Sequence, residues 1–243
     1  MLRPGSGAIR RPPFRSPHHG ASAPALVGGG AGPRPGEISL ATGGVLFLDE
    51  LTEFSRGALE ALRQPLEDGE LVVARAAGRV RFPARVQLVA AANPCPCGGA
   101  GGCTCTNERI ERYRARLSGP LIDRLDLVVR VDPPDPEAMT HDRPETTKVV
   151  AERVAAARDW QVARGQAIPN ARLELAELER LGIAADAREL LERAAGSGRL
   201  SARRQVRVLR LARSAADLAR SGGVAREHVA EALALIPRGK GLG

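Results

Sequence analysis

Aromatic residues make up only 2% of this 243-residue chain, although hydrophobic residues as a whole make up 43%. The interior must therefore be built mainly from Leu, Val, Ile and Ala, which favours helices and short buried strands. No apolar run approaches the roughly 18 residues that a membrane helix needs. We therefore expect no membrane span and place the chain in the cytoplasm.

Lysine is also scarce, because Lys148 and Lys240 are the only two, so nearly all the positive charge is carried by Arg. A formal net charge of +8 ordinarily indicates an anionic partner such as DNA. The codon bias of a GC-rich genome explains an Arg-, Ala- and Gly-rich chain equally well. Both explanations stay open at this point.

Cysteine is absent from the chain except in one short loop, which holds Cys95, Cys97, Cys103 and Cys105. Four thiolates are the ligand count of a closed structural Zn²⁺ site. The C-x-C spacing is tighter than the usual C-x2-C knuckle, so the loop must bend between Gly98 and Gly102 to reach tetrahedral geometry. Reduced thiols are the first alternative, and disulfides fit a cytosolic chain least.

The first half of the chain alternates short apolar runs with turn-rich stretches. Residues 1–36 are dense in Pro, Gly, Arg and Ser, so we expect no core of their own there. The patterns then predict a buried parallel strand over Gly44–Glu50, a helix over Ser55–Leu66 with Ser55 as N-cap, a β-hairpin over Glu70–Phe82, and a second buried strand over Arg85–Asn93.

A strand is predicted near Leu127–Val131, and Pro133, Pro134 and Pro136 then mark a linker. Everything beyond is predicted to be helical, in segments near Pro144–Arg164, Ala171–Leu181, Asp186–Ala195, Ser201–Ser221 and Ala225–Leu235. The sequence thus predicts two domains, residues 1–136 and 137–243.

Two carboxylates end the first buried strand, at Asp49 and Glu50. One carboxylate at a strand tip can hold Mg²⁺, and its neighbour can orient or deprotonate an attacking water. Asn93 ends the second strand and can position that water or contact a γ-phosphate. The alternatives are solvated acids at a turn and, for Asn93 before Pro94, an ordinary turn residue.

His18 and His19 are adjacent, and on an extended segment neighbouring side chains point to opposite sides. A shared metal site is therefore not expected. Their role stays unassigned.

Several stretches together resemble the YifB/ComM family of magnesium-chelatase-like AAA+ proteins. They are "RPPFRSPHHGASAPALVGGG", "PRPGEISLATGGVLFLDEL", "ALRQPLEDGE", "FPARVQLVAAANPCPCG", "RYRARLSGPLIDRLDL" and "SARRQVRVLRLARSAADL". The resemblance implies an α/β fold, a truncated AAA+ P-loop NTPase core with a mostly parallel sheet, followed by an all-helical lid domain. It also implies a hexameric ring with ATP and Mg²⁺ bound between subunits.

The resemblance implies roles for individual residues. Asp49 and Glu50 would be the Walker B pair and Asn93 the sensor-1 residue. Arg124, in "LIDRLDL", would be the arginine finger for the next subunit, and Arg203 the sensor-2 residue, with Arg204 and Arg207 as close rivals. Spacing alone favours a salt bridge of Arg124 with Asp123 or Asp126, and it favours a solvated helix face for Arg203. Only the resemblance indicates the other roles.

The chain departs from the family pattern in one respect: it contains no GxxxxGK[ST] motif, the loop that grips phosphates. A fragment, a misplaced start codon or a split gene would explain this departure. We expect these 243 residues alone to be inactive as an ATPase.

The resemblance implies DNA remodelling, as branch migration in transformation or recombination. The hairpin carries Arg75, Arg79 and Arg81, which suit contact with a phosphate backbone. An ordinary solvated hairpin is the alternative. Two other functions remain in view: a magnesium-chelatase motor subunit for tetrapyrrole metal insertion, and a non-catalytic, zinc-stabilised nucleic-acid-binding module.

Overall fold

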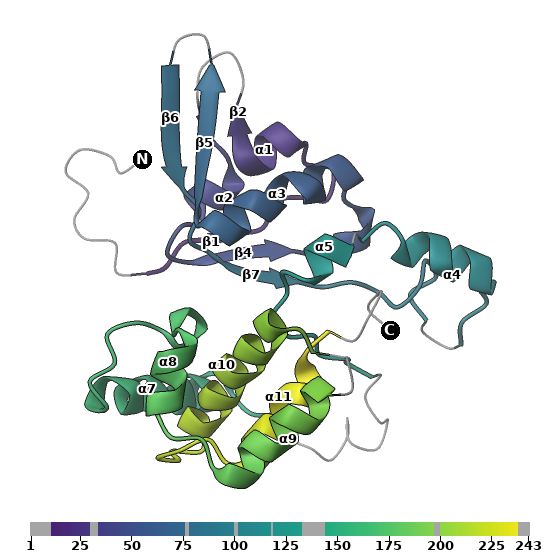
Figure 1. The fold of residues 1–243 in the computed structure, drawn as a ribbon. Helices are drawn as coiled ribbons and strands as arrows, with labels where there is room; N and C mark the ends of the chain where they lie inside the picture. The colour runs from purple at the N-terminus through teal and green to yellow at the C-terminus, as the bar shows by residue number, and fades with distance from the viewer. Residues whose placement is uncertain are drawn as a thin grey trace. The chain divides into compact units, whose positions relative to one another are not determined.

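The structure, a computed structural model, describes residues 11–29, 34–75, 78–99, 102–117, 119–132, 144–196 and 200–237; of residues 74, 75 and 78 it describes the backbone alone. The chain forms two compact units (Figure 1). Unit 1 comprises Met1–Leu125 and Pro237–Gly243, and unit 2 comprises Asp126–Ile236. The predicted linker prolines lie outside the described residues.

Unit 1 is built on a parallel sheet of three short strands, in the order β1-β4-β7. These strands are β1 (Phe14–Arg15), β4 (Val45–Leu48) and β7 (Gln87–Ala90). Gly44 precedes β4 where the backbones approach closely, since a Cβ there would lie 1.9 Å from the carbonyl oxygen of Pro13. The parallel sheet confirms the predicted α/β class. The second strand was predicted to be buried, but β7 is only partly buried, and its Val89 is 38% exposed.

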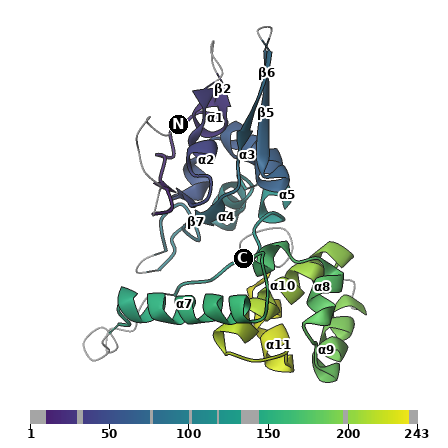
Figure 2. The ribbon, with the colours of Figure 1, turned by 90° about the vertical axis from the view of Figure 1, so that its left-hand side faces the viewer.

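The described part of unit 1 also contains helices and two further strand pairs, most of which lie on one side of this sheet (Figure 2). They are α1 (Ala23–Val27), β2 (Gly28–Gly29), β3 (Arg34–Pro35), α2 (Glu37–Leu40), α3 (Arg56–Asp68), β5 (Glu70–Arg75), β6 (Gly78–Pro83), α4 (Asn107–Arg114) and α5 (Gly119–Ile122), with a 3-10 turn η1 (Leu51–Glu53) after β4. The hairpin β5–β6 is antiparallel and forms its own sheet, as predicted.

Helix α3 supplies much of the unit 1 core. The Ser55 hydroxyl accepts a hydrogen bond from the Ala58 N–H at 3.2 Å, which satisfies one of the free donors at the helix start and confirms the predicted N-cap. Leu59 and Leu62 of α3 are buried in the same hydrophobic cluster as Leu46 and Leu48 of β4. The Pro- and Gly-rich start also contributes, because Leu26 of α1 is fully buried there. Residues 1–36 are expected to have no core of their own, and the described part of this segment contributes instead to the shared core of unit 1.

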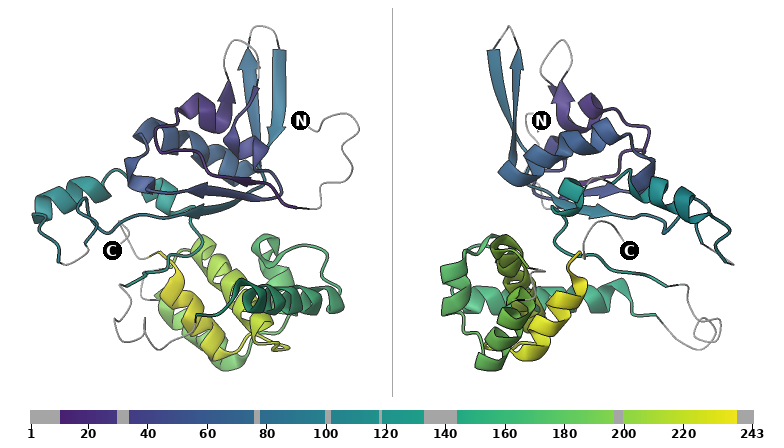
Figure 3. Two further views of the ribbon diagram at one scale, coloured as in Figure 1. Left: turned by 180° about the vertical axis from the view of Figure 1, so that it is seen from behind. Right: turned by 45° about the vertical axis from the view of Figure 1, so that its right-hand side comes forward.

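The helices of unit 2 lie beyond residue 144, where the sequence predicts helices, whereas residues 126–132 of this unit are not helical (Figure 3). Its elements are α7 (Thr147–Ala163), a 3-10 turn η2 (Asn170–Arg172), α8 (Leu175–Arg180), α9 (Ala185–Gly196), α10 (Ala202–Leu218) and α11 (Arg226–Leu235). Helix α10 lies against α7, α8 and α11, and buries Val208, Leu209, Ala212 and Ala216. The helix predicted over Ala171–Leu181 is broken, because Glu174 starts a new helix by donating its N–H to the Glu177 side chain at 2.7 Å.

The strand predicted near Leu127–Val131 is not formed. Val128 instead donates its backbone N–H to the carbonyl of Leu235 in α11 at 2.7 Å, and Val131 is 86% exposed. Leu127, Val129 and Val131 alternate as in a strand. The backbone of this segment instead forms a hydrogen bond with the end of helix α11. Among the described helices, none has the length and apolar character needed to cross a membrane.

Candidate nucleotide and metal sites

The parallel strands β4 and β7 place their carboxyl ends at one edge of the sheet. Leu48 pairs with Ala90, the Ala91 N–H donates to the Leu48 carbonyl at 3.0 Å, and the Leu51 N–H donates to the Ala91 carbonyl at 2.8 Å. Asp49 and Glu50 follow β4 at this edge, and Asn93 follows β7 shortly after the pairing ends. Ligands in open parallel sheets are bound at such carboxyl ends.

Glu50 has an unusual backbone conformation. Its φ of 50° and ψ of 47° lie in the left-handed region, which costs a non-glycine residue about 1–2 kcal/mol. The Glu50 N–H donates to Oδ1 of Asp49 at 2.9 Å, so the strained turn holds the two acids in a fixed relation. Both side chains remain exposed. Such strain is commonly retained at functional sites.

His19 contacts this acidic pair directly. Its Nδ1 lies 2.7 Å from Oε2 of Glu50, and a hollow of about 270 Å³ is lined by Ser16, Pro17, His18, His19, Asp49 and Glu50. The expectation that the two histidines point to opposite sides is wrong. A turn at this point, with the Ala21 N–H bonded to the His18 carbonyl, brings the ring centroids to 4.0 Å. Sequence reasoning missed β1, whose carboxyl end delivers His18 and His19 to the same edge.

Asn93 lines a different, much smaller hollow of about 10 Å³, together with Thr52, Pro94, Tyr113, Arg114 and Leu117. That volume accommodates about one water molecule. The Thr52 hydroxyl and the Tyr113 phenol form a buried hydrogen bond beside it. Asn93 therefore shares the sheet edge with Asp49 and Glu50, but it does not line their hollow. Its role as sensor 1 stays a prediction.

Arg124 follows the short helix α5 in unit 1. Its guanidinium forms an ion pair with Glu67 near the end of α3, and the Arg124 side chain is 18% exposed. The sequence suggested Asp123 or Asp126 as the ion-pair partner of Arg124, but the partner in the structure is Glu67. Asp126 forms an ion pair with Arg207 at 3.1 Å. A finger for the next subunit would have to exchange this ion pair for a phosphate, and that role stays a prediction.

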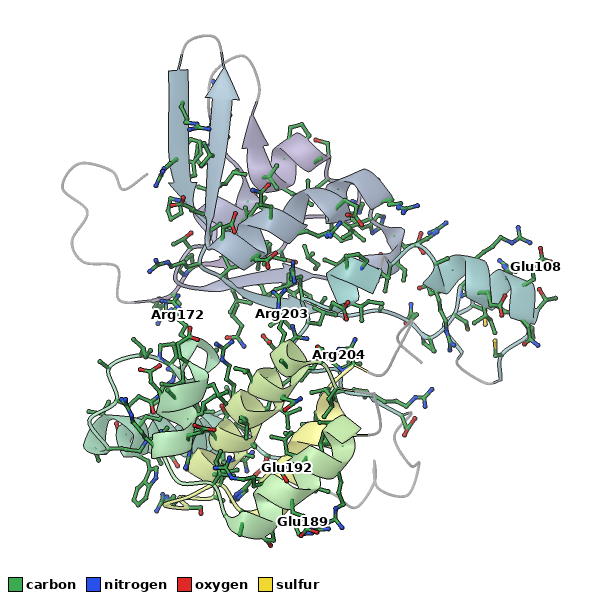
Figure 4. The ribbon with its side chains drawn as sticks, in the orientation of Figure 1. Glu108, Arg172, Glu189, Glu192, Arg203 and Arg204 are labelled. Atoms are coloured by element: carbon green, nitrogen blue, oxygen red, sulfur yellow. The ribbon has the colours of Figure 1, made fainter. Side chains whose placement is uncertain are left out.

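Arg203 lies in the first turn of α10, in unit 2 (Figure 4). The Ser201 hydroxyl caps this helix by accepting the Arg204 N–H at 3.4 Å. The Arg203 side chain is exposed and Arg204 is half-buried. Arg207 forms an ion pair with Asp126 at 3.1 Å. The role of Arg203 as sensor 2, with Arg204 and Arg207 as rivals, stays a prediction.

The four cysteines form a compact cluster. Their sulfur atoms lie within 4.8 Å of one another, with Cys95 Sγ 3.2 Å from Cys97 Sγ and 3.4 Å from Cys103 Sγ. Four sulfurs on a tetrahedral zinc ion, each about 2.3 Å from it, are separated by about 3.8 Å. All four cysteines are free rather than in disulfides. The donor set and its spacing therefore fit Zn²⁺.

The thiols of this cluster differ in acidity. Hydrogen bonding by the Cys95 thiol lowers the pKa of Cys97 to about 6, and the backbone N–H groups of Gly99 and Thr104 act in the same direction. The same contact with Cys97 raises the pKa of Cys95, and burial adds to the rise. Burial raises the pKa of Cys105. One thiolate is therefore available near neutral pH, which is the form that ligates metals.

The hairpin arginines have distinct surroundings. Arg79 is exposed, and Arg81, also exposed, lies 3.4 Å from the Glu70 carboxylate on the neighbouring strand. Register pairs Ala74 with Arg79 and Val72 with Arg81, so both arginines lie on one face of the hairpin. The Arg75 side chain and the hairpin tip at residues 76–77 lie outside the described part. An exposed pair such as Arg81–Glu70 is weak enough to be exchanged for a phosphate.

Comparison with known proteins identifies the family of most of the chain. Residues 2–139 match the family described as magnesium chelatase, subunit ChlI, and residues 144–235 match magnesium chelatase, subunit ChlI C-terminal. The chain is 49% identical over 226 residues to competence protein ComM of Haemophilus influenzae, which covers 91% of this chain and 44% of that protein. It is 44% identical over 229 residues to YifB of Escherichia coli, covering 92% of this chain and 45% of that protein.

The chain therefore spans less than half the length of these relatives. The boundary between the two family matches falls between residues 139 and 144, close to the predicted linker. The parallel sheet and the two acidic residues after β4 are consistent with both family matches. The chain belongs to the magnesium chelatase subunit ChlI family of AAA+-type ATPases, and ComM and YifB proteins are among its relatives.

Proposed function

We propose that this chain is part of a ring-forming, ATP-hydrolysing motor that remodels DNA, acting in branch migration. The observation that carries the proposal is the strained Asp49–Glu50 turn at the carboxyl end of β4, which opens onto a hollow of about 270 Å³. An oxygen-rich strand tip of this kind fits Mg²⁺ and the phosphates that accompany it. The cytoplasm, where ATP and DNA occur together, is the proposed location.

Each residue has a proposed task in that reaction. Asp49 is the residue that would hold Mg²⁺, which would neutralise charge on the phosphates. Glu50 orients the attacking water and accepts its proton, because it lies next to the metal ligand and stays exposed. Asn93 helps to position the same water. Arg203 contacts the γ-phosphate from the lid, and Arg124 acts as a finger in the adjacent subunit of a hexamer.

DNA is proposed as the partner on two grounds. One relative is named competence protein ComM, and competence is the capacity to take up DNA. The hairpin presents Arg79 and Arg81 on one face, which suits contact with phosphates and needs no reading of bases. The formal net charge of +8 works in the same direction.

The family description favours a second function, a motor subunit that drives magnesium insertion into a tetrapyrrole. The nucleotide site would be the same in both cases, and only the coupled partner differs. A non-catalytic binding module held together by its cysteines is the third candidate. Zn²⁺ is proposed at Cys95, Cys97, Cys103 and Cys105 for all three, because the sulfur spacing fits it.

The test uses a reconstituted protein, meaning this chain joined behind a P-loop segment taken from a full-length family member. ATP turnover is measured alone, with branched DNA, and with a tetrapyrrole and its chelatase partner subunits. We expect turnover that DNA stimulates and that Glu50→Gln abolishes. Stimulation by the tetrapyrrole system alone would select the second function, and turnover that survives Glu50→Gln would refute the proposed site.

A further inference from the structure

Helix α4 connects the cysteine cluster with the acidic turn, the turn that carries Asp49 and Glu50. The helix begins at Asn107, just after Cys105, ends close to the 3-10 turn η1, and projects from the rest of unit 1 (Figure 1). Tyr113, at 6% exposed, is the one buried side chain among the residues of α4, all of which the structure describes. The position of this helix therefore depends on contacts at its two ends.

The C-terminal end of α4 is bonded to η1. The Tyr113 phenol forms a buried hydrogen bond with the hydroxyl of Thr52, which is 2% exposed. Just after the helix, Nη1 of Arg116 donates to the Thr52 carbonyl at 3.1 Å and to Oε2 of Glu53 at 3.0 Å. The ion pair of Arg116 with Glu53 is exposed and weak by itself. The buried bond is the stronger part of this connection, because a buried hydroxyl that loses its partner is costly.

The 3-10 turn η1 in turn holds the acidic turn. The Glu53 N–H donates to the Glu50 carbonyl at 2.7 Å, and the Leu51 N–H donates to the carbonyl of Ala91, beyond β7, at 2.8 Å. Glu50 keeps its left-handed conformation, with φ of 50°, between these two bonds. Because η1 has only three residues, a displacement of Thr52 must change the backbone of Glu50 as well.

The N-terminal end of α4 is held by the cysteine loop. Cys95 follows Asn93 closely in the chain and is 3% exposed. Cys105 comes just before Thr106, whose hydroxyl caps α4 by accepting the Arg109 N–H at 3.4 Å. Four thiolates on one metal ion cross-link the loop that carries them, and such sites lose order when the metal is removed. The start of α4 should therefore be fixed only while the cluster holds metal.

We propose that the cysteine cluster is a control site for the acidic turn, and that α4 transmits its state through Tyr113 and Thr52. The inference rests on the proposed Zn²⁺ in the cluster and on the proposed role of Glu50. With metal bound, α4 is fixed and Glu50 is kept in its strained conformation. Without metal, α4 is released and the turn relaxes. Tyr113 acts through η1, so it is a positioning residue.

Hydrogen exchange of this chain, measured by mass spectrometry, tests the proposal without any enzymatic activity. Exchange is measured with Zn²⁺ supplied and after the metal has been removed by a chelator. Removal should speed the exchange of the Leu51 and Glu53 amides about 10-fold or more, because the bonds that protect them loosen with η1. Amides in strands β5 and β6 and in helix α10 should not change, which distinguishes a local response from unfolding.

Two variants test the path through α4. Tyr113→Phe keeps the ring and removes the hydroxyl that is bonded to Thr52. The amides of η1 should then exchange about 10-fold faster even with zinc bound, and the chelator should have a much smaller further effect. Arg112→Ala is the matched control, because Arg112 precedes Tyr113 in α4 and forms an exposed ion pair with Glu108 (Figure 4). It should respond to the chelator as the unaltered chain does.

Failure of this inference is distinguishable from failure of the proposals on which it rests. If added zinc neither binds nor changes exchange, the proposed Zn²⁺ falls and this inference falls with it. If zinc binds but its removal changes only residues 94–114, the metal site stands and the control of the acidic turn is refuted. A Tyr113→Phe chain with an unaltered response to the chelator would refute the path through α4.

The reconstituted protein gives a second readout. Tyr113→Phe should lower kcat about 10-fold and leave KM for ATP unchanged, because the residue sets the position of the base and does not bind nucleotide. An unchanged kcat in Tyr113→Phe, with Glu50→Gln inactive, would leave Glu50 as the base and overturn the positioning role. Turnover that survives Glu50→Gln would instead refute the proposed base.

Discussion

Asp217 in α10 is the residue whose replacement should cost unit 2 the most stability. Its side chain is fully buried, and its two oxygens accept hydrogen bonds from four side chains. Arg213 donates from Nε at 3.0 Å and Arg164 from Nη1 at 2.6 Å. Asn170 donates at 2.7 Å and Gln161 at 3.0 Å. This network ties α7 and η2 to the helix that carries Arg203.

Asp217→Ala leaves the Arg213 guanidinium, which is also fully buried, without its counter-ion. Removing one partner of a buried ion pair costs about 3–5 kcal/mol, a large share of the roughly 5–15 kcal/mol that stabilises a domain. Glu189→Ala is the matched control, because Glu189 and Arg193 in α9 form an exposed pair with the same i,i+4 spacing. That pair should contribute only about 0.3–0.5 kcal/mol.

Trp160, the only tryptophan, lies in α7 of unit 2, so its fluorescence follows the unfolding of this unit in urea. The double variant Asp217→Leu with Arg213→Met should lose less stability than Asp217→Ala, because no buried charge of this pair is left unpaired. A loss below about 1 kcal/mol for Asp217→Ala would refute the reasoning. So would a double variant less stable than the single one.

The same network predicts how stability depends on pH. Burial alone raises the pKa of Asp217, but hydrogen bonds from Arg164 and Asn170 and the charge of Arg213 outweigh it, so the pKa lies below its ordinary value. A depressed pKa in the folded state stabilises fully above the unfolded value of about 3.9. The contribution should be constant at neutral pH and disappear as the pH falls through the folded value. Asp217→Asn should remove this acid-sensitive part.

The remaining predictions concern the sites. The 243 residues alone should hydrolyse ATP negligibly, because they contain no phosphate-gripping GxxxxGK[ST] loop; turnover that Glu50→Gln abolishes would contradict this. In the reconstituted protein, Arg124→Ala should cut turnover by about 10³ or more with nucleotide affinity intact, and mixing it with Glu50→Gln subunits should restore some activity if the finger acts in trans. Replacing Arg75 and Arg79 with Ala should flatten the plot of log K for DNA against log salt by roughly one to two units per subunit engaged, and an unchanged slope would exclude them from the DNA path. Elemental analysis should find about one Zn²⁺ per chain, and removing it with a chelator should expose four titratable thiols; four such thiols without zinc beforehand would decide for a metal-free cluster.

Patterns among neighbouring residues predicted those elements that are formed by contacts within one short segment. The Ser55 cap and the apolar spacing of Leu59 and Leu62 were sufficient to predict α3, because a helix satisfies its own backbone. The apolar run ending in two acids likewise predicted β4. The four-cysteine cluster could be predicted because all its members lie in one loop.

Contacts between distant parts of the chain could not be predicted in this way. Arg124 binds Glu67, and both local alternatives were nearer in sequence. Val128 pairs with the end of α11 rather than with a strand. The contact of His19 with Glu50 depends on β1 lying beside β4, and a two-residue strand leaves almost no periodic signal in the sequence.

The most direct test of the central claim is branch migration by the reconstituted protein on a fluorescently labelled DNA junction. Protein with Glu50 intact should move the junction only when ATP is supplied, and Glu50→Gln should still bind the junction but leave it in place. A protein that hydrolyses ATP at the same rate with and without DNA, and never moves the junction, would contradict the account.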